Sequence, residues 1–301
     1  MFSEDDVKKH DIDTIKKWLR DSVGRSVVPI KYITTGTILC RGVSCQDGRP
    51  VRIQRISYPP SDRATLQRAS RIGQPRFYCS VASPAPFYEL HAKQGDLVGL
   101  SFWEVMEPLW LHNLGFHPST LREIGAQERS IVGREQLIKA IPDESEANDK
   151  IRGEFSRIFA QYVPDEKSYL YEQSIAINEF LDEFEIFFPD GPGTPVKKEI
   201  AGTAYPSLQM RGDADNVVLL PKFVHSSLRL NSVQYVKVEG ANDERSAYRF
   251  LTIGISESFS DGQNINWFET LGSETDRQCS IAIEDGHWVT RRGDGSIFYS
   301  V

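Results

Sequence analysis

The residues with the clearest potential for chemistry lie in the segment Q-R-A-S-R-I-G-Q-P-R-F-Y-C-S-V-A-S-P-A-P-F-Y-E, which runs from Gln67 to Glu89. It contains Arg68, a glycine–proline turn, Tyr78 and the carboxylate of Glu89. Arginine offers a planar fork for phosphate, tyrosine an aromatic face for a ring, and glutamate a fixed negative charge. These groups would suit an anionic, ring-bearing small molecule such as a nucleotide.

Arginines recur along this part of the chain. Arg41 follows the apolar run I-T-T-G-T-I-L-C, and we expect it at the end of a strand, where a guanidinium would bind a diphosphate in bidentate fashion. Arg68 has neighbours of the same type in Arg63, Arg71 and Arg76. With 35 Lys and Arg in the chain, most of these side chains belong to the surface or to ion pairs. The sequence leaves open which arginine faces a ligand.

The candidate carboxylate and hydroxyl lie in contrasting contexts. Glu89 follows P-A-P-F-Y, and we expect it in the first turns of a helix over residues 85–94. A carboxylate among apolar neighbours is desolvated and needs a cationic partner or a role, although most glutamates are solvated surface groups. Ser207 lies in A-G-T-A-Y-P-S, a predicted loop-to-strand junction. A tyrosine in the position of Tyr78 lies in the core more often than it stacks on a ligand.

Several classes of site are not indicated. Ser207 lacks the G-x-S-x-G frame of a serine hydrolase, and the six histidines show no H-E-x-x-H. No G-x-G-x-x-G follows a strand and no G-K-[ST] loop occurs. Cys40 and Cys45, in a predicted turn, lack zinc-site spacing, and we expect the four cysteines to be reduced thiols. The sequence predicts neither a metal nor a bound cofactor.

An ordered series of short motifs over roughly residues 32–220 resembles the RES domain family, which is named for its arginine, glutamate and serine. The motifs are Arg41, Tyr58-Pro59-Pro60, Arg68, Gly73, Tyr78, Glu89, Tyr205-Pro206-Ser207 and Asn216-Val217-Val218-Leu219. Two positions depart from the family pattern. Cys40 stands where the family often has an aromatic residue, and Ser70 where many members have asparagine.

The resemblance implies a fold similar to ADP-ribosyltransferases and a toxin that degrades NAD+. Such toxins are usually paired with an antitoxin that carries an Xre-type DNA-binding domain. Carried over to this chain, the site residues are catalytic Glu89, Arg41 and Ser207 and substrate-binding Arg68, Tyr78 and Asn216. NAD+ would be the substrate, and no cofactor is implied.

Cleavage of the bond between nicotinamide and ribose passes through a ribose cation, as in glycoside hydrolysis. The carboxylate of Glu89 would stabilise that charge and bind a hydroxyl group. Arg41 and Arg68 would hold the diphosphate, and Tyr78 would face the nicotinamide. Ser207 would hydrogen-bond the ribose or orient Glu89. Because nicotinamide leaves as a neutral ring, no strong general acid is needed.

Three functions stay open at this point. The first is an NAD+ glycohydrolase or phosphorylase, in which water or phosphate accepts the ADP-ribose. The second is an ADP-ribosyltransferase that modifies a protein target. Such transferases often carry an acidic or glutamine residue two positions before the catalytic glutamate, where this chain has Phe87. The third is a catalytically silent module that binds NAD+ or a partner.

The elements that must position these residues follow from hydrophobic patterning. Helices are predicted over 3–19, 85–94, 147–162 and 167–184, and a mixed strand-and-loop region over 27–55. Strands are predicted over 76–81, 217–220, 233–238, 248–255, 280–283 and 288–291. A loop is predicted over 189–195, and turns at Asp261-Gly262, Asp285-Gly286 and Asp294-Gly295.

The predicted fold class is α+β, with an ADP-ribosyltransferase-like mixed or antiparallel β core and flanking helices. We divide the chain into an N-terminal helical segment (1–30), a catalytic domain (31–240) and a β-rich extension of the same globule (241–301). The formal net charge of −7 disfavours direct nucleic-acid binding, because phosphate attraction needs a basic surface. The first residues do not resemble a signal peptide and no apolar run approaches the ~20 residues of a membrane span, so we expect a cytoplasmic protein.

Overall fold

The structure, a computed structural model, describes residues 3–23, 28–81, 85–139, 145–188, 195–242, 247–268, 273–284 and 287–300. These residues form an α+β fold around a twelve-stranded sheet of order β1-β5-β8-β9-β3-β2-β4-β10-β11-β14-β15-β16. Its pairs are antiparallel, except that β5 and β8 run parallel. In sheet order the strands are Ile30–Ile33, Leu109–Asn113, Gly202–Pro206, Asp215–Leu219, Phe77–Ser80, Ile38–Ser44, Leu97–Val105, Leu228–Ala241, Tyr248–Ser256, Gln278–Glu284, His287–Arg292 and Ile297–Ser300.

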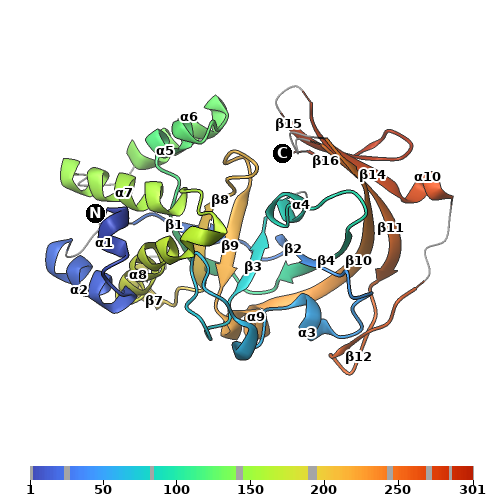
Figure 1. Ribbon diagram of the computed structural model, residues 1–301, viewed down its shortest axis with the longest axis horizontal. Coiled ribbons are helices and arrows are strands. Elements are labelled where there is room, and N and C mark those ends of the chain that lie inside the picture. The colour runs from blue at the N-terminus through green and yellow to red at the C-terminus, as the bar shows by residue number, and fades with distance from the viewer. Residues whose placement is uncertain are drawn as a thin grey trace.

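Helices gather around the β1 end of this sheet (Figure 1). They are α1 (Glu4–Val7), α2 (Ile12–Ser22), α5 (Pro118–Glu123), α6 (Glu128–Lys139), α7 (Glu146–Phe159) and α8 (Tyr171–Leu181). Apolar side chains at helical spacing on α2, α7 and α8 form one core with Tyr205 and Val218 of the sheet. Among the described residues, no helix has both the length and the apolar character needed to cross a lipid bilayer.

The remaining elements are short. The helices are α3 (Ile53–Ile56), α4 (Ala85–Glu89), α9 (Pro221–Ser227), α10 (Glu274–Arg277) and the 3₁₀ helices η1 (Ser61–Arg63) and η2 (Asp165–Leu170). Two hairpins lie outside the main sheet, β6 (Ile186–Phe188) with β7 (Val196–Lys198) and β12 (Phe259–Ser260) with β13 (Asn264–Ile265). The predicted turn at Asp261-Gly262 joins β12 to β13, and the one at Asp294-Gly295 joins β15 to β16.

Most of the predicted elements are confirmed, with different ends. The strands predicted over 76–81, 217–220, 233–238, 248–255, 280–283 and 288–291 correspond to β3, β9, β10, β11, β14 and β15. Within the region 27–55, β1 and β2 are the strands, and the helix predicted over 147–162 corresponds to α7. The Asp285-Gly286 turn and residues 189–194 of the predicted loop lie outside the described residues.

Three helices were predicted with the wrong extent. The segment 3–19 is divided into α1 and α2, because the Asp11 carboxylate accepts a hydrogen bond from the Thr14 N–H (2.8 Å) and so starts a second helix. The helix predicted over 85–94 ends at Glu89, because His91 adopts a left-handed backbone conformation (φ 48°). The helix predicted over 167–184 begins as η2 and continues as α8.

The sequence analysis assigned no element to β4 and β5, and both are structurally central. β4 lies between β2 and β10, and its interior side chains are buried on both faces of the sheet. Such a strand reads as a continuous apolar run rather than as an alternation, so the period-2 pattern that marks a half-buried strand is missing. β4 joins the two halves of the sheet.

Helix α4 lies against the strands that follow β4 in the sheet. Phe87 and Tyr88 are almost fully buried. The Phe87 ring stacks on Phe250 of β11 with centroids 4.7 Å apart, and Tyr88 packs edge-on against Trp288 of β15 at 4.9 Å. Since such aromatic pairs add to the burial of apolar surface, the strands of 241–301 hold α4 in place. They also continue the main sheet.

On its other side, α4 approaches β2 at a glycine. A Cβ atom on Gly42 would lie 2.7 Å from Cβ of Pro86 and 3.0 Å from Cδ1 of Leu90. Real Cβ atoms do not come that close to other carbon atoms, so a larger residue at position 42 would push the helix away. Gly42 therefore sets the distance between α4, which ends in Glu89, and β2, which carries Arg41.

Candidate functional site

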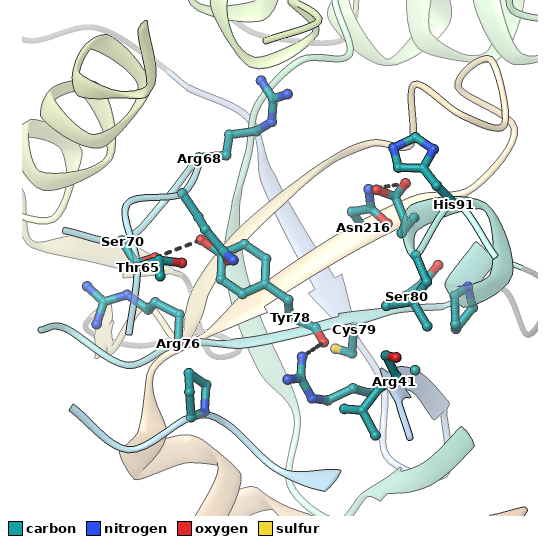
Figure 2. Close-up of a pocket in the computed structure, with 18 of the residues that line it drawn as sticks. Arg41, Thr65, Arg68, Ser70, Arg76, Tyr78, Cys79, Ser80, His91 and Asn216 are labelled. Atoms are coloured by element: carbon teal, nitrogen blue, oxygen red, sulfur yellow. Dashed lines mark hydrogen bonds between the residues drawn. The ribbon is translucent and has the colours of Figure 1, made fainter. Parts of the chain in front are cut away.

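A cleft of about 1140 Å³ opens over β2, β3 and β9 beside the end of α4. Five of the six predicted site residues line it: Arg41, Arg68, Tyr78, Glu89 and Asn216. They come from four elements and one loop, and sheet order brings them together because β3 pairs with β9 on one side and β2 on the other. Figure 2 shows Tyr78 in the middle of this arrangement, between Arg41, Arg76 and Asn216.

The carboxylate of Glu89 is held by two neutral donors. The Ser207 hydroxyl donates to Oε1 of Glu89 at 2.5 Å, and the Asn216 side-chain amide donates to the same oxygen at 2.9 Å. No donor to Oε2 is described. An ion pair would offset the negative charge of Glu89, whereas these two neutral donors leave that charge in place. The residue is exposed in the cleft, so the carboxylate is anchored through one oxygen and presents the other.

Ser207 lies behind Glu89 and not in the cleft lining. It is fully buried, and a tight turn holds it, in which its N–H donates to the Ala214 carbonyl (2.8 Å) and its Oγ accepts from the Met210 N–H (3.3 Å). The hydroxyl proton is left to donate to Glu89. Of the two roles open for Ser207, the geometry favours orientation of Glu89 over contact with a ligand.

Arg41 is a cation without an acidic partner in the described part of the chain. Its Nε donates to the Ser57 carbonyl (3.0 Å) and its Nη1 to the Tyr78 carbonyl (2.7 Å), the bond drawn in Figure 2. Its Cζ lies 5.5 Å from the centroid of the Phe77 ring. Burial lowers the pKa of the Arg41 guanidinium to about 10. A desolvated cation that faces a cleft and lacks a carboxylate is chemically suited to bind an anion.

Tyr78 is held by its hydroxyl and presents its ring. The hydroxyl accepts a hydrogen bond from the Ala69 N–H (3.2 Å) and shares one with the Ser70 hydroxyl (3.0 Å), while the ring lines the cleft. Ser70 is itself buried. Ser70 therefore fixes the orientation of the Tyr78 ring in the cleft.

The three rival arginines have different surroundings. Arg71 forms ion pairs with Glu179 (2.5 Å) and Asp13 (2.7 Å) and does not line the cleft. Arg68 lines it, but its two Nη atoms donate to the Ile158 and Gln161 carbonyls at the C-terminal end of α7. Arg76 lines the cleft and donates only to the Pro75 carbonyl, at 3.5 Å, among the contacts described.

The structure corrects four local expectations. Arg41 lies inside β2 rather than at the end of a strand, because pairing with β4 continues to Ser44. Glu89 is the last residue of α4 and is exposed, not desolvated, because the burial of α4 falls on the four residues before it. Ser207 follows strand β8 rather than preceding a strand.

The fourth correction concerns the cysteines. Cys40 lies within β2 and not in a turn, whereas Cys45 directly follows the strand and starts a turn in which its carbonyl accepts from the Gly48 N–H (3.0 Å); both cysteines are buried. The four cysteines are free. Burial raises the pKa of the Cys40 thiol in β2 and of the Cys79 thiol in β3, so neither is a thiolate nucleophile at neutral pH.

Comparison with known proteins adds no assignment. The chain matches no protein-family model, no curated protein and no solved structure. The described residues hold no group of three or more His, Cys, Asp and Glu side chains placed to bind a metal ion. The functional argument therefore depends on the cleft itself.

Tyr171, Tyr205 and His91 also line the cleft and were not among the predicted site residues. Tyr171 and Tyr205 each place a ring centroid 5.5 Å from Cζ of Arg68, so the guanidinium lies between two aromatic faces. His91 lines the cleft two residues after Glu89. Tyr205 belongs to the Y-P-S motif and was within reach of sequence reasoning. Tyr171 gave no signal, because it comes from α8, more than a hundred residues after Arg68.

Proposed function

We propose that this protein is an NAD+-degrading enzyme that cleaves the bond between nicotinamide and ribose. In this proposal the chain is a RES domain protein with an ADP-ribosyltransferase-like fold, and water or phosphate accepts the ADP-ribose. One observation carries the proposal. A carboxylate held by a serine and an asparagine, a half-buried arginine with no acidic partner among the described residues, and an anchored tyrosine ring share one cleft, although their sequence positions run from 41 to 216.

Glu89 has the geometry that the reaction needs. As the bond to nicotinamide breaks, positive charge develops on the ribose, and a fixed carboxylate next to it lowers the energy of that state. Because Oε1 is engaged by Ser207 and Asn216, Oε2 is the atom that would accept a ribose hydroxyl. The two donors hold the carboxylate in one orientation between substrate binding and bond cleavage.

The rest of the cleft fits the other parts of NAD+. Arg41 would bind the diphosphate through the N–H groups that its two backbone contacts leave unused. Tyr78 would present its ring to the nicotinamide. A volume of about 1140 Å³ lies above the ~300–1,000 Å³ usual for ligand pockets and leaves room for a dinucleotide and an acceptor.

Transfer of ADP-ribose to a protein is less well supported. Phe87 occupies the position where such transferases often carry an acidic or glutamine residue, and it is 1% exposed. Its ring stacks on Phe250 in the core beneath α4. Phe87 therefore has no access to an acceptor protein, and a small acceptor such as water or phosphate fits this site better.

The test is nicotinamide release from NAD+ by purified protein, with and without phosphate. We expect release by the wild type and a loss of about 10²–10³-fold in Glu89→Ala, with folding checked by circular dichroism. A wild-type protein that binds NAD+ without consuming it would support the silent binding module instead. Labelled protein after incubation with labelled NAD+ would support the transferase.

The biological setting is part of the same proposal and rests on the resemblance. An enzyme that depletes NAD+ would act as a toxin in the cytoplasm, where its substrate is, and an antitoxin with an Xre-type domain would restrain it. Expression of the wild type should stop cell growth and lower cellular NAD+, while Glu89→Ala should do neither. Growth arrest without a fall in NAD+ would contradict this role.

A further inference from the structure

Helix α4 ends in a turn that normally contains glycine. The Ala92 N–H donates to the Phe87 carbonyl and the His91 N–H to the Tyr88 carbonyl, each at 3.0 Å. These are the two hydrogen bonds of a Schellman motif, in which the residue at the position of His91 adopts the left-handed conformation. The φ angle of His91 is 48°, as the motif requires.

Glycine is the residue that adopts this conformation most easily, and a side chain at this position carries a conformational cost. Histidine tolerates it better than most residues but less well than glycine. The other described non-glycine residues with positive φ are Arg211 (51°), in the turn that holds Ser207, and Asp261 (54°), between β12 and β13. The imidazole at position 91 is therefore not a requirement of the turn.

The turn aims this imidazole at the reaction site. His91 is exposed and lines the cleft, two residues after Glu89. Figure 2 draws it beside Asn216, which binds Glu89 Oε1. Since the Schellman bonds fix the backbone at His91, the point from which its side chain extends into the cleft is set relative to Glu89.

We propose that His91 is a catalytic general base that activates water as the acceptor, which deepens the proposed function and rests on it. The bond between ribose C1′ and the nicotinamide nitrogen breaks, and its electron pair leaves with the neutral nicotinamide. The water oxygen forms the new bond to C1′, and its proton passes to the imidazole and then to solvent. The products are ADP-ribose, nicotinamide and one proton.

The test compares His91→Gly and His91→Asn with the wild type in phosphate-free buffer. Both replacements tolerate a left-handed backbone, so we expect an unchanged or higher melting temperature in His91→Gly. We expect kcat for nicotinamide release to fall about 10²-fold in both, with KM for NAD+ little changed. Free imidazole should restore part of the rate of His91→Gly.

Asp261→Gly is the matched control, because it relieves the same backbone conformation outside the cleft and should leave kcat unchanged. A rate equal to wild type in His91→Gly would overturn the proposal, and so would a loss expressed only in KM or a loss that imidazole does not reduce. The two hypotheses fail differently. A wild type that releases no nicotinamide contradicts the proposed function, whereas an active wild type with an equally active His91→Gly contradicts only the role of His91.

Discussion

The contact between Ser207 and Glu89 allows a quantitative test of how the carboxylate is positioned. Ser207→Ala removes a hydrogen bond of 2.5 Å to a charged oxygen. Hydrogen bonds to charged groups contribute about 1.5–3 kcal/mol. If that free energy is lost in the transition state, then at about 1.4 kcal/mol per factor of ten the rate should fall roughly 10- to 150-fold.

Whether Ser207→Ala changes kcat or KM separates the two roles considered for Ser207, orientation of Glu89 and contact with the ribose. Because the side chain is fully buried behind Glu89, we expect the loss in kcat, with KM for NAD+ within about twofold of wild type. The assay is steady-state nicotinamide release over a range of NAD+ concentrations. A raised KM with unchanged kcat would refute orientation of Glu89 and favour a direct contact with the ribose.

A control is needed because Ser207→Ala also leaves the Met210 N–H without its acceptor, which costs about 1–3 kcal/mol of folding stability. Ser256 matches Ser207 in burial, and its Oγ likewise accepts from a backbone N–H, that of Ser258. It lies in β11 and does not line the cleft. Ser256→Ala should lower the melting temperature by a similar amount and leave kcat unchanged. A parallel loss of kcat in both variants would mean that instability alone explains the effect.

Three further predictions follow from the surroundings of the cleft. Gly42→Ala should displace α4 and lower kcat by at least about tenfold, while Gly133→Ala, whose added Cβ meets no atom within 4 Å, should leave it unchanged. Arg41→Ala should raise KM for NAD+ about tenfold or more. We expect pyrophosphate to raise the melting temperature of the wild type and not that of Arg41→Ala; an equal rise in both would argue against an anion site at Arg41. Trp288→Ala should cost about 3–5 kcal/mol in chemical denaturation, because Trp288 is 2% exposed and packs on Tyr88, and should lower kcat in protein that is still folded; full activity would show that α4 does not depend on the last strands.

Local patterns were sufficient for much of the fold. The strand over 248–256 and the helix over 146–159 follow from the period of their apolar residues, because each buries one face more than the other. Strand β4 did not follow, since burial on both faces removes the alternation. The end of α4 at Glu89 did not follow either, because a histidine stands where the turn would favour glycine.

The sequence by itself established the fold class, most of the elements and six residues with suitable chemistry, because residue type and local order are sequence properties. Only the tertiary structure could separate Arg68, Arg71 and Arg76. The Ile158 carbonyl, 90 residues away, accepts from Arg68, and Glu179, 108 residues away, forms an ion pair with Arg71. The link between Ser207 and Glu89 spans 118 residues and exists because β8 and β9 return beside β3. Which atoms face a cleft depends on contacts of this range, and no local pattern encodes them.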